Sequence, residues 1–363
     1  MLPPPDPAPR PSRRRFTALM GALALAGGPW PAAGAEGAAP DAGAGGGGLD
    51  ADLLARAVER AAALPRLHAL IVARDGVPVV ERVFRGPGLD RPANVKSVAK
   101  AVISALVGSA IDRGVLAGVE QRVAPLLGEL VPADADPRVG RITVGHLLAM
   151  QAGLERTSGA NYGRWVTSRN WVRHALSRPF VDEPGGGMLY STGSSHLLSA
   201  LLTRVTGRST LTLAREWLGE PLGIAVPPWP RDPQGIYFGG NDMLLSPWAL
   251  LRFGELYRAG GRFAGRRVLP ESWVRASWTP RTRSVFTGHG YGYGWFVTEM
   301  RGHRVPYAWG YGGQMLHVVP DLGLTVVMTS DATAPGREAG HVQALRTLLA
   351  DGIVPAAARG APA

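Results

Sequence analysis

A serine and a lysine lie three residues apart in this chain, at Ser97 and Lys100, within the stretch SVAK. The apolar sequence that follows predicts a helix, and helix positions i and i+3 share one face with Cβ atoms about 5 to 6 Å apart. A serine hydroxyl is a poor nucleophile that needs an adjacent base. Burial lowers the pKa of a lysine amine, so a lysine can be that base. The spacing therefore predicts a nucleophile paired with its base.

The basic composition strengthens this prediction. Of 39 Lys and Arg residues in the 363-residue chain, only Lys96 and Lys100 are lysines. An arginine guanidinium stays protonated, so a lysine at position 100 indicates a need for an amine that titrates. The alternative is that Ser97 caps the helix and Lys100 lies on its surface. However, the apolar neighbours of Lys100 predict a buried helix, in which an unpaired ammonium is costly.

A second candidate group follows a glycine-rich turn, PGGGMLYSTG at residues 184–193, which presents Tyr190 and Thr192 just before another apolar helix. Here the chain resembles the β-lactamase-related serine hydrolases, the group of class C β-lactamases, DD-peptidases, esterases and 6-aminohexanoate-dimer hydrolases. SVAK matches the S-x-x-K motif of that family, and Tyr190-Ser191-Thr192 matches its Y-x-N motif with Thr in place of Asn. Supporting stretches at 142–154, 190–202 and 238–257 extend the resemblance over about residues 50–352.

The resemblance implies both a fold and a reaction. The expected fold is α+β and β-lactamase/transpeptidase-like, with an antiparallel sheet built from both chain ends, flanking helices and an inserted all-helical subdomain. The expected reaction is acyl transfer, in which Ser97 attacks an ester or amide carbonyl with help from Lys100 and Tyr190 before water releases the acyl group. A neighbouring ammonium would lower the pKa of Tyr190, which then acts as an anionic base or passes protons with Lys100. The sequence leaves these two roles open.

The third motif of the family, K-T-G or H-x-G on a strand, finds no lysine here because none follows Lys100. Its expected counterpart is the Tyr-Gly-Gly run at 311–313, where paired glycines let the backbone approach a ligand closely; a tight turn is the alternative. The resemblance implies an oxyanion hole formed by the backbone N–H groups of Ser97 and Gln314. The substrate-binding residues that it implies are Thr192, Tyr311, Gly312 and Gly313.

This departure bears on the substrate. The third-motif cation of penicillin-recognising enzymes helps to hold a substrate carboxylate, and the comparable position here is the neutral Tyr311. An ester or a small linear or cyclic amide is therefore favoured over a β-lactam, although an arginine from elsewhere in the chain could replace the missing cation. Two alternatives remain: a catalytically silent binding or sensor protein on the same fold, and a DD-peptidase or β-lactamase.

Composition excludes several other classes. The chain has no cysteine, so disulfides, thiolate nucleophiles and Cys-ligated zinc are ruled out. Its 8 His include no H-E-x-x-H pattern, and we expect neither a metal nor a cofactor. The formal net charge is +11, but the arginines are scattered among acidic residues. No nucleic-acid partner is therefore expected. The oligomeric state is left open.

The amino terminus predicts export. Residues 12–16 read SRRRF, the apolar stretch at 16–28 is too short to span a bilayer, and AGA at 33–35 offers a cleavage site. We therefore expect a twin-arginine signal peptide at 1–35 and a mature protein in the periplasm or medium without a stable membrane anchor. A flexible Gly/Ala linker is expected at 36–48 and a disordered tail at 356–363.

Between these segments we expect one hydrolase domain, 49–355, with a sheet part at about 49–95 and 235–355 and a helical part at about 96–234. Hydrophobic periodicity predicts helices at 51–64, in the run from 97 to 127, after Thr143, at 194–206, after Ser246-Pro247 and at about 340–349. The predicted strands are 67–74, 78–84, 293–298, 314–319 and 323–329. The Asp-Gly pair at 75–76 predicts a hairpin between the first two strands.

Overall fold

The structure, a computed structural model, describes residues 48–333 and 340–360. The predicted signal peptide and all but the last residue of the predicted linker lie outside these residues. The main sheet has the strand order β2-β1-β12-β11-β10-β9-β8-β7 and is antiparallel throughout. Its strands are β1 Leu67–Arg74, β2 Val77–Val83, β7 Thr282–Arg283, β8 Gly290–Tyr291, β9 Phe296–Met300, β10 His303–Gly310, β11 Gln314–Val319 and β12 Leu324–Ser330. Two short pairs join β3 Ala93–Asn94 to β4 Leu244–Leu245 and β5 Arg262–Phe263 to β6 Arg266–Arg267.

Both ends of the domain contribute to this sheet, as the sequence predicts. Strand β1 pairs with β2 on one side and with β12, about 250 residues later, on the other. The β1–β2 hairpin turns at Asp75 and Gly76, whose φ angles of 49° and 82° suit an Asp-Gly turn. The predicted α+β fold with a sheet assembled from both chain ends is confirmed.

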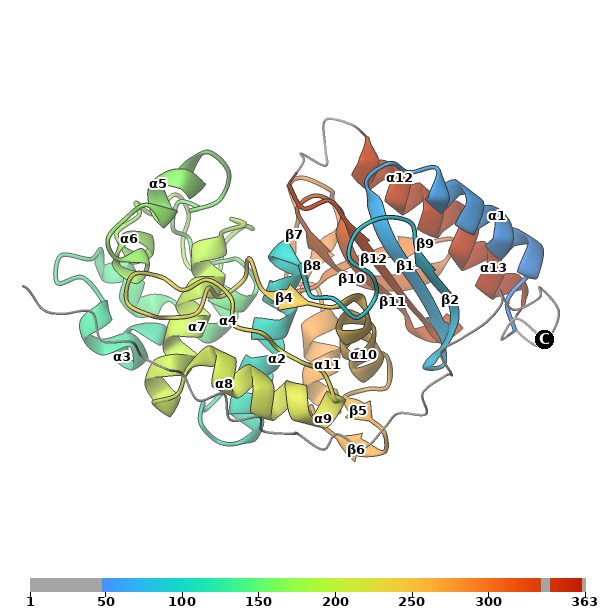
Figure 1. Ribbon diagram of the computed structural model, residues 1–363. Coiled ribbons are helices and arrows are strands. Elements are labelled where there is room, and N and C mark those ends of the chain that lie inside the picture. The colour runs from blue at the N-terminus through green and yellow to red at the C-terminus, as the bar shows by residue number, and fades with distance from the viewer. Residues whose placement is uncertain (1–47, 334–339, 361–363) are drawn as a thin grey trace, which may run out of the picture. The chain divides into compact units, whose positions relative to one another are not determined.

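Helices cover both faces of the sheet. Helices α1 Ala51–Ala62, α12 His341–Leu348 and α13 Val354–Arg359 pack on one face, at the right of Figure 1. Helix α10 Pro247–Arg258 packs against β11 and β12 on the other face, and α11 Glu271–Trp278 adds Trp273 and Trp278 to the same core. Successive residues of β12 alternate between the two cores, Val326 in one and Val327 in the other. The strand therefore reads as a continuous apolar run.

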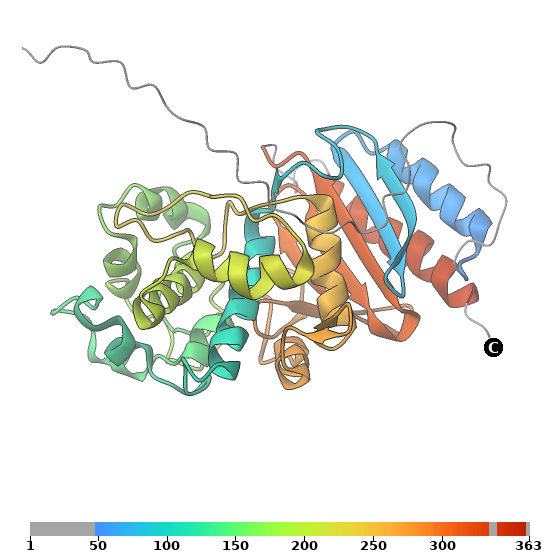
Figure 2. The same ribbon diagram turned by 60° about the horizontal axis from the view of Figure 1, so that its bottom comes forward.

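The remaining helices form the helical part of the domain (Figures 1 and 2). They are α2 Ala99–Asp112, α3 Val123–Leu127, α4 Val144–Leu148, α5 Tyr162–Val166, α6 Trp171–Leu176, α7 Thr192–Thr206, α8 Thr210–Ala214 and α9 Glu220–Leu222. Helix α2 is buried from Ala99 to Ala110 and contacts α7, α8 and β10, so it joins the helical part to the sheet. Any group carried at its start therefore lies between the two parts of the domain.

The structure differs from the sequence predictions at several places. Strand β10 was not predicted, because Pro306 interrupts its apolar run, and α11 was not predicted either. The helix after Thr143 has only five residues, and the chain leaves it through Met150, whose φ is 62°. The predicted tail at 356–363 is helical as far as Arg359, since Ala356 and Ala357 are fully buried against α1 and the sheet.

Candidate active site

The start of α2 carries Ser97 in an unusual local conformation. Ser97 lies in a short 3-10 helix, Lys96–Val98, and Lys96 has a φ of 49° that non-glycine residues rarely adopt. The backbone N–H of Lys96 donates to Asn94 Oδ1 at 2.9 Å, which holds this bend. Helix α2 begins at Ala99 without a side-chain capping bond. The alternative that Ser97 is only a helix cap therefore finds no support.

Lys100 lies beneath Ser97, with only 3% of its surface exposed. Its Nζ atom is 2.9 Å from Ser97 Oγ, 2.6 Å from the carbonyl oxygen of Gly240 and 3.4 Å from Thr192 Oγ1. A neutral amine has two N–H donors and one lone pair. Donation to Gly240 and Thr192 uses both N–H groups and leaves the lone pair for the Ser97 hydroxyl. The three contacts fit either protonation state: an ammonium donates to all three oxygens, and a neutral amine donates to Gly240 and Thr192 and accepts from Ser97.

Burial makes the unprotonated form of Lys100 accessible at neutral pH. Burial lowers the pKa of Lys100 from 10.5 to about 7, and the negative charge of Asp242 opposes this shift. No carboxylate makes an ion pair with Lys100 within residues 48–333 and 340–360. At neutral pH a substantial fraction of the amine is therefore unprotonated and can accept the Ser97 proton.

Tyr190 reaches the same point from the segment that precedes α7. Lys100 Nζ lies 5.0 Å from the centre of the Tyr190 ring, and the ring packs on Tyr291 and Phe296 at centroid distances of 6.2 and 6.3 Å. Burial raises the pKa of Tyr190 to about 12, against the opposing effect of a hydrogen bond with Ser97. The expected lowering of this pKa is thus not found. A neutral phenol can donate or relay a proton, whereas the anionic base is disfavoured at neutral pH.

A loop to which the sequence analysis assigned no role completes the surroundings of Lys100. Residues 239–242, here called the GGND loop, present the Gly240 carbonyl that accepts from Lys100. At one end the Gly239 N–H donates to His196 Nδ1 at 3.3 Å, and His196 Nε2 contacts Asp232 at 3.0 Å in a fully buried pair.

At the other end of the GGND loop, Lys96 Nζ contacts Asp242 Oδ1 at 2.9 Å, and Asn94 Nδ2 donates to the same oxygen at 2.8 Å. The loop is therefore fixed at both ends. Lys96, the other lysine of the chain, could have been found by the scarcity argument that identified Lys100. The sequence FGGND lies in the stretch 238–257 that supports the family resemblance, but its residue types alone predict only a turn.

Only part of the segment that carries the predicted third motif packs against the Ser97 region. Gln314 pairs with Gly310 across the β10–β11 hairpin, and a Cβ placed on Gly310 would lie 2.4 Å from the Val95 carbonyl oxygen. Gly310 is therefore the glycine that packs against the segment before Ser97. A Cβ on Gly312 or Gly313 would instead meet the Asp331 carbonyl or His341, and Tyr311 is 52% exposed. The oxyanion-hole and substrate-binding roles at 311–314 stay predictions.

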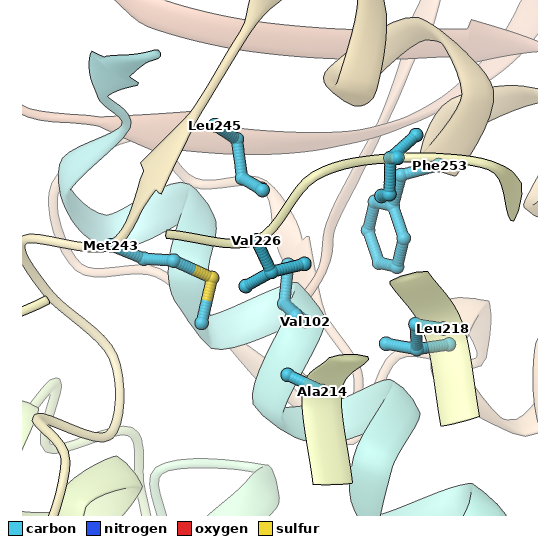
Figure 3. A pocket seen from close by; sticks show the side chains of 8 residues that line it. Val102, Ala214, Leu218, Val226, Met243, Leu245 and Phe253 are labelled. Carbon is cyan, nitrogen blue, oxygen red and sulfur yellow. The ribbon is translucent and has the colours of Figure 1, made fainter. Parts of the chain in front are cut away.

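One internal cavity can be set aside. A void of about 10 Å³ lies between α2, α8 and α10, lined only by apolar side chains that include Val102, Met243 and Phe253 (Figure 3). It is too small for a substrate, and an apolar cavity of this size stays dry.

In the part of the chain that the structure describes, no three His, Asp or Glu residues are grouped to hold a metal ion, and no helix is long and apolar enough to cross a membrane.

Replacing Asp242 by asparagine tests this electrostatic arrangement. The base works unprotonated, so kcat/KM should rise as the pH increases through the pKa of Lys100, about 7. Asp242 raises this pKa, so Asp242→Asn should shift the rise to lower pH. A pH–kcat/KM profile measures the shift. Asp112→Asn is the matched control, since it removes one carboxylate from the far end of α2, about 18 Å along the helix. An unchanged or upward-shifted profile for Asp242→Asn contradicts the arrangement.

A helix-borne serine, a buried lysine and a tyrosine from a second segment, set between a sheet and a helical part, define the class of β-lactamase-fold serine hydrolases. The chain belongs to the beta-lactamase family: the model of that family, described as Beta-lactamase, matches residues 51–350. None of the curated proteins matches the sequence.

Solved structures with the same fold are distant in sequence. A putative 6-aminohexanoate-dimer hydrolase from Bacillus anthracis is 18% identical, with a TM-score of 0.67 over 80% of this chain and 79% of its own. EstCE1, a hydrolase with promiscuous acyltransferase activity, is also 18% identical, with a TM-score of 0.67 over 82% and 98%. A D-stereospecific amidohydrolase from Streptomyces sp. is 20% identical, with a TM-score of 0.62 over 81% and 97%.

Proposed function

We propose that this protein is an exported serine hydrolase that cleaves a small ester or amide through an acyl-enzyme on Ser97. The observation that carries the proposal is the 2.9 Å contact between Ser97 Oγ and the buried amine of Lys100. In the neutral amine, donation to Gly240 and Thr192 uses both N–H groups and leaves the lone pair for the serine hydroxyl.

In the first step, Lys100 accepts the Ser97 proton while Ser97 Oγ forms a bond to the substrate carbonyl carbon. The backbone N–H groups of Ser97 and Gln314 stabilise the resulting oxyanion, a contribution of about 2.7 to 4 kcal/mol for each donor. The leaving alcohol or amine then takes a proton from Lys100, relayed by the neutral Tyr190 phenol. Water then attacks the acyl-enzyme carbonyl while its proton passes through Tyr190 to Lys100. Lys100 returns this proton to Ser97 Oγ, which releases the acid and free Ser97.

Labelling with a fluorophosphonate probe tests the nucleophile. The expected result is a single covalent adduct, located on Ser97 by peptide mass mapping and absent from Ser97→Ala. Turnover of 4-nitrophenyl esters, nitrocefin and D-alanyl peptides by both proteins then assigns the reaction class. Turnover mainly of nitrocefin or the peptides favours a β-lactamase or a DD-peptidase. A protein that neither reacts with the probe nor turns over any substrate is a silent binding protein, and the proposal fails.

Export is supported by the SRRRF stretch and the AGA site in the amino-terminal sequence. Fractionation of cells that produce the full chain tests this part of the proposal. The expected result is mature protein outside the cytoplasm, and full-length protein confined to the cytoplasm contradicts it.

A further inference from the structure

A buried histidine and aspartate support the GGND loop from the side of α7. His196 belongs to α7 and Asp232 precedes the loop, and the side chains of both are completely shielded from solvent. His196 Nε2 lies 3.0 Å from Asp232 Oδ2. A buried carboxylate is costly, which indicates that Asp232 has a role beyond packing.

Hydrogen bonds determine where the proton of His196 lies. Asp232 Oδ1 accepts the backbone N–H groups of Gln234 and Ile236, each at 2.9 Å. Its Oδ2 atom is left to accept from His196 Nε2. On the other side of the ring, the Gly239 N–H donates to His196 Nδ1, so Nδ1 must offer its lone pair. The imidazole is therefore the tautomer that carries its proton on Nε2.

Three aromatic rings hold the imidazole in this orientation. Their centroids lie 5.3 to 5.9 Å from its own, and they belong to Trp165, Trp171 and Phe238. The indole N–H groups of both tryptophans donate to backbone carbonyls instead of to the imidazole. Asp232 and Gly239 are therefore the hydrogen-bond partners of the His196 ring, and turning the ring would break both bonds.

The histidine is connected to the catalytic amine through one short segment. Gly239 is followed by Gly240, whose carbonyl oxygen is 2.6 Å from Lys100 Nζ. A Cβ on Gly239 would lie 2.8 Å from His196 Cα, so the loop lies directly on the turn of α7 that carries His196. Thr192, one helical turn earlier on α7, contacts the same amine at 3.4 Å. Helix α7 therefore sets two of the three contacts of Lys100, one directly and one through His196.

We infer that His196 and Asp232 are positioning residues that hold the GGND loop, and with it the carbonyl beneath Lys100, in the geometry for proton transfer. Asp232 fixes the tautomer of His196, whose Nδ1 atom holds the loop by the N–H of Gly239. The inference rests on the proposed function, since it concerns the amine that activates Ser97. Neither side chain touches the reacting atoms, so both act through the loop.

Asp232→Asn tests the role of the tautomer. The asparagine oxygen can keep the two backbone N–H groups, which leaves its NH₂ group facing His196 Nε2. Nε2 must then accept, so the proton moves to Nδ1 and meets the N–H of Gly239. We expect kcat to fall by about 10- to 100-fold with KM little changed, because the displaced group takes part in the chemistry and not in binding. Histidine ¹⁵N NMR should find the proton on Nε2 in wild type and on Nδ1 in the variant.

The pH profile separates positioning from a general loss of folded protein. A carbonyl that accepts from an ammonium stabilises the charged form, so moving it away lowers the pKa of Lys100 further. The rise of kcat/KM with pH should therefore shift below about 7 in Asp232→Asn. Of the other titratable groups that face Lys100, Tyr190 is neutral near pH 7 and Asp242 stays bound at the far end of the loop. A smaller folded fraction would lower the rate equally at every pH.

Two substitutions at position 196 divide the role of the ring. His196→Asn can place its amide oxygen where Nδ1 accepts from Gly239. His196→Gln can reach Asp232 but offers Gly239 no acceptor at the Nδ1 position. We expect the asparagine variant to retain more kcat than the glutamine variant. Urea unfolding checks that each variant is folded, and this pair decides the inference if Asp232→Asn does not fold.

Asp136→Asn is the matched control. Asp136 also accepts the backbone N–H two residues later, but it is not paired with a histidine in the part of the chain that the structure describes. It should keep the kcat and the pH midpoint of wild type. A folded Asp232→Asn with wild-type kcat and midpoint, or equal kcat in the two variants at position 196, overturns the positioning role while hydrolysis stands. If wild type turns over no ester, the proposed function fails. Hydrogen exchange of the Gly239 N–H, faster in Asp232→Asn only if the pair holds the loop, then decides the inference.

Discussion

Replacing Lys100 by arginine is expected to lower kcat/KM by about 10²- to 10⁴-fold, the range that a positioned general base contributes. Arginine preserves the positive charge but stays protonated under any assay condition. It therefore has no lone pair to receive the Ser97 proton. The structure adds a second reason, since Lys100 Nζ is already only 2.6 Å from the Gly240 carbonyl oxygen and leaves no room for a longer side chain. Initial rates with a 4-nitrophenyl ester, from acid to alkaline pH, measure the loss.

The chain supplies an unusually direct control for this variant. Lys96→Arg makes the same substitution at the only other lysine, four residues earlier, where an ion pair with Asp242 requires charge alone. It should retain most of its activity. Lys100→Met, which is neutral, should fail as Lys100→Arg does. If Lys100→Arg stays active while Lys100→Met is inactive, position 100 needs a charge and not a base, and the proposed mechanism is wrong.

The local parts of this structure could be predicted from the sequence because their causes are local. The helix at α1, the hairpin at Asp75-Gly76 and the helix after Ser246-Pro247 each depend on a periodicity or a turn residue within a few positions. Strand β10 could not be predicted in this way. Pro306 lacks an N–H and argues against a central strand, yet β9 and β11 pair on its two sides.

The same distinction between local and long-range causes applies to the candidate site. The Ser97–Lys100 pair lies on one helical turn, so its spacing alone predicts the contact that the structure shows. The third motif depends on which glycine of the β10–β11 hairpin packs against the Ser97 segment. The sheet register sets this contact, and Gly310 is the glycine that packs there, while the roles predicted for 311–313 stay predictions. The GGND loop is a further case, since its partners His196 and Lys96 are more than 40 residues away.

That loop yields the second large expected effect. Gly240 has a φ of 125°, and a Cβ placed on it would lie 2.6 Å from Ser195 Cβ and 2.9 Å from Lys100 Cγ. Both distances are shorter than ordinary contacts between carbon atoms. An alanine at this position must therefore move the loop, Lys100 or both. Each of these movements separates the Gly240 carbonyl from the amine that it holds, and the lone pair of that amine turns away from Ser97.

Gly240→Ala is accordingly expected to lower kcat/KM by about 10²-fold, the cost of a misplacement of about 1 Å at a reacting group. Gly235→Ala is the matched control: its φ is also positive, at 85°, but a Cβ there would meet nothing within 4 Å. A non-glycine residue at positive φ strains the backbone, so both variants should be less stable than wild type. Urea unfolding measures this loss as a lower free energy of unfolding. Only Gly240→Ala should also lose activity. Equal activity losses in the two variants would mean that the loop matters for stability alone, and that the Gly240 carbonyl does not orient Lys100.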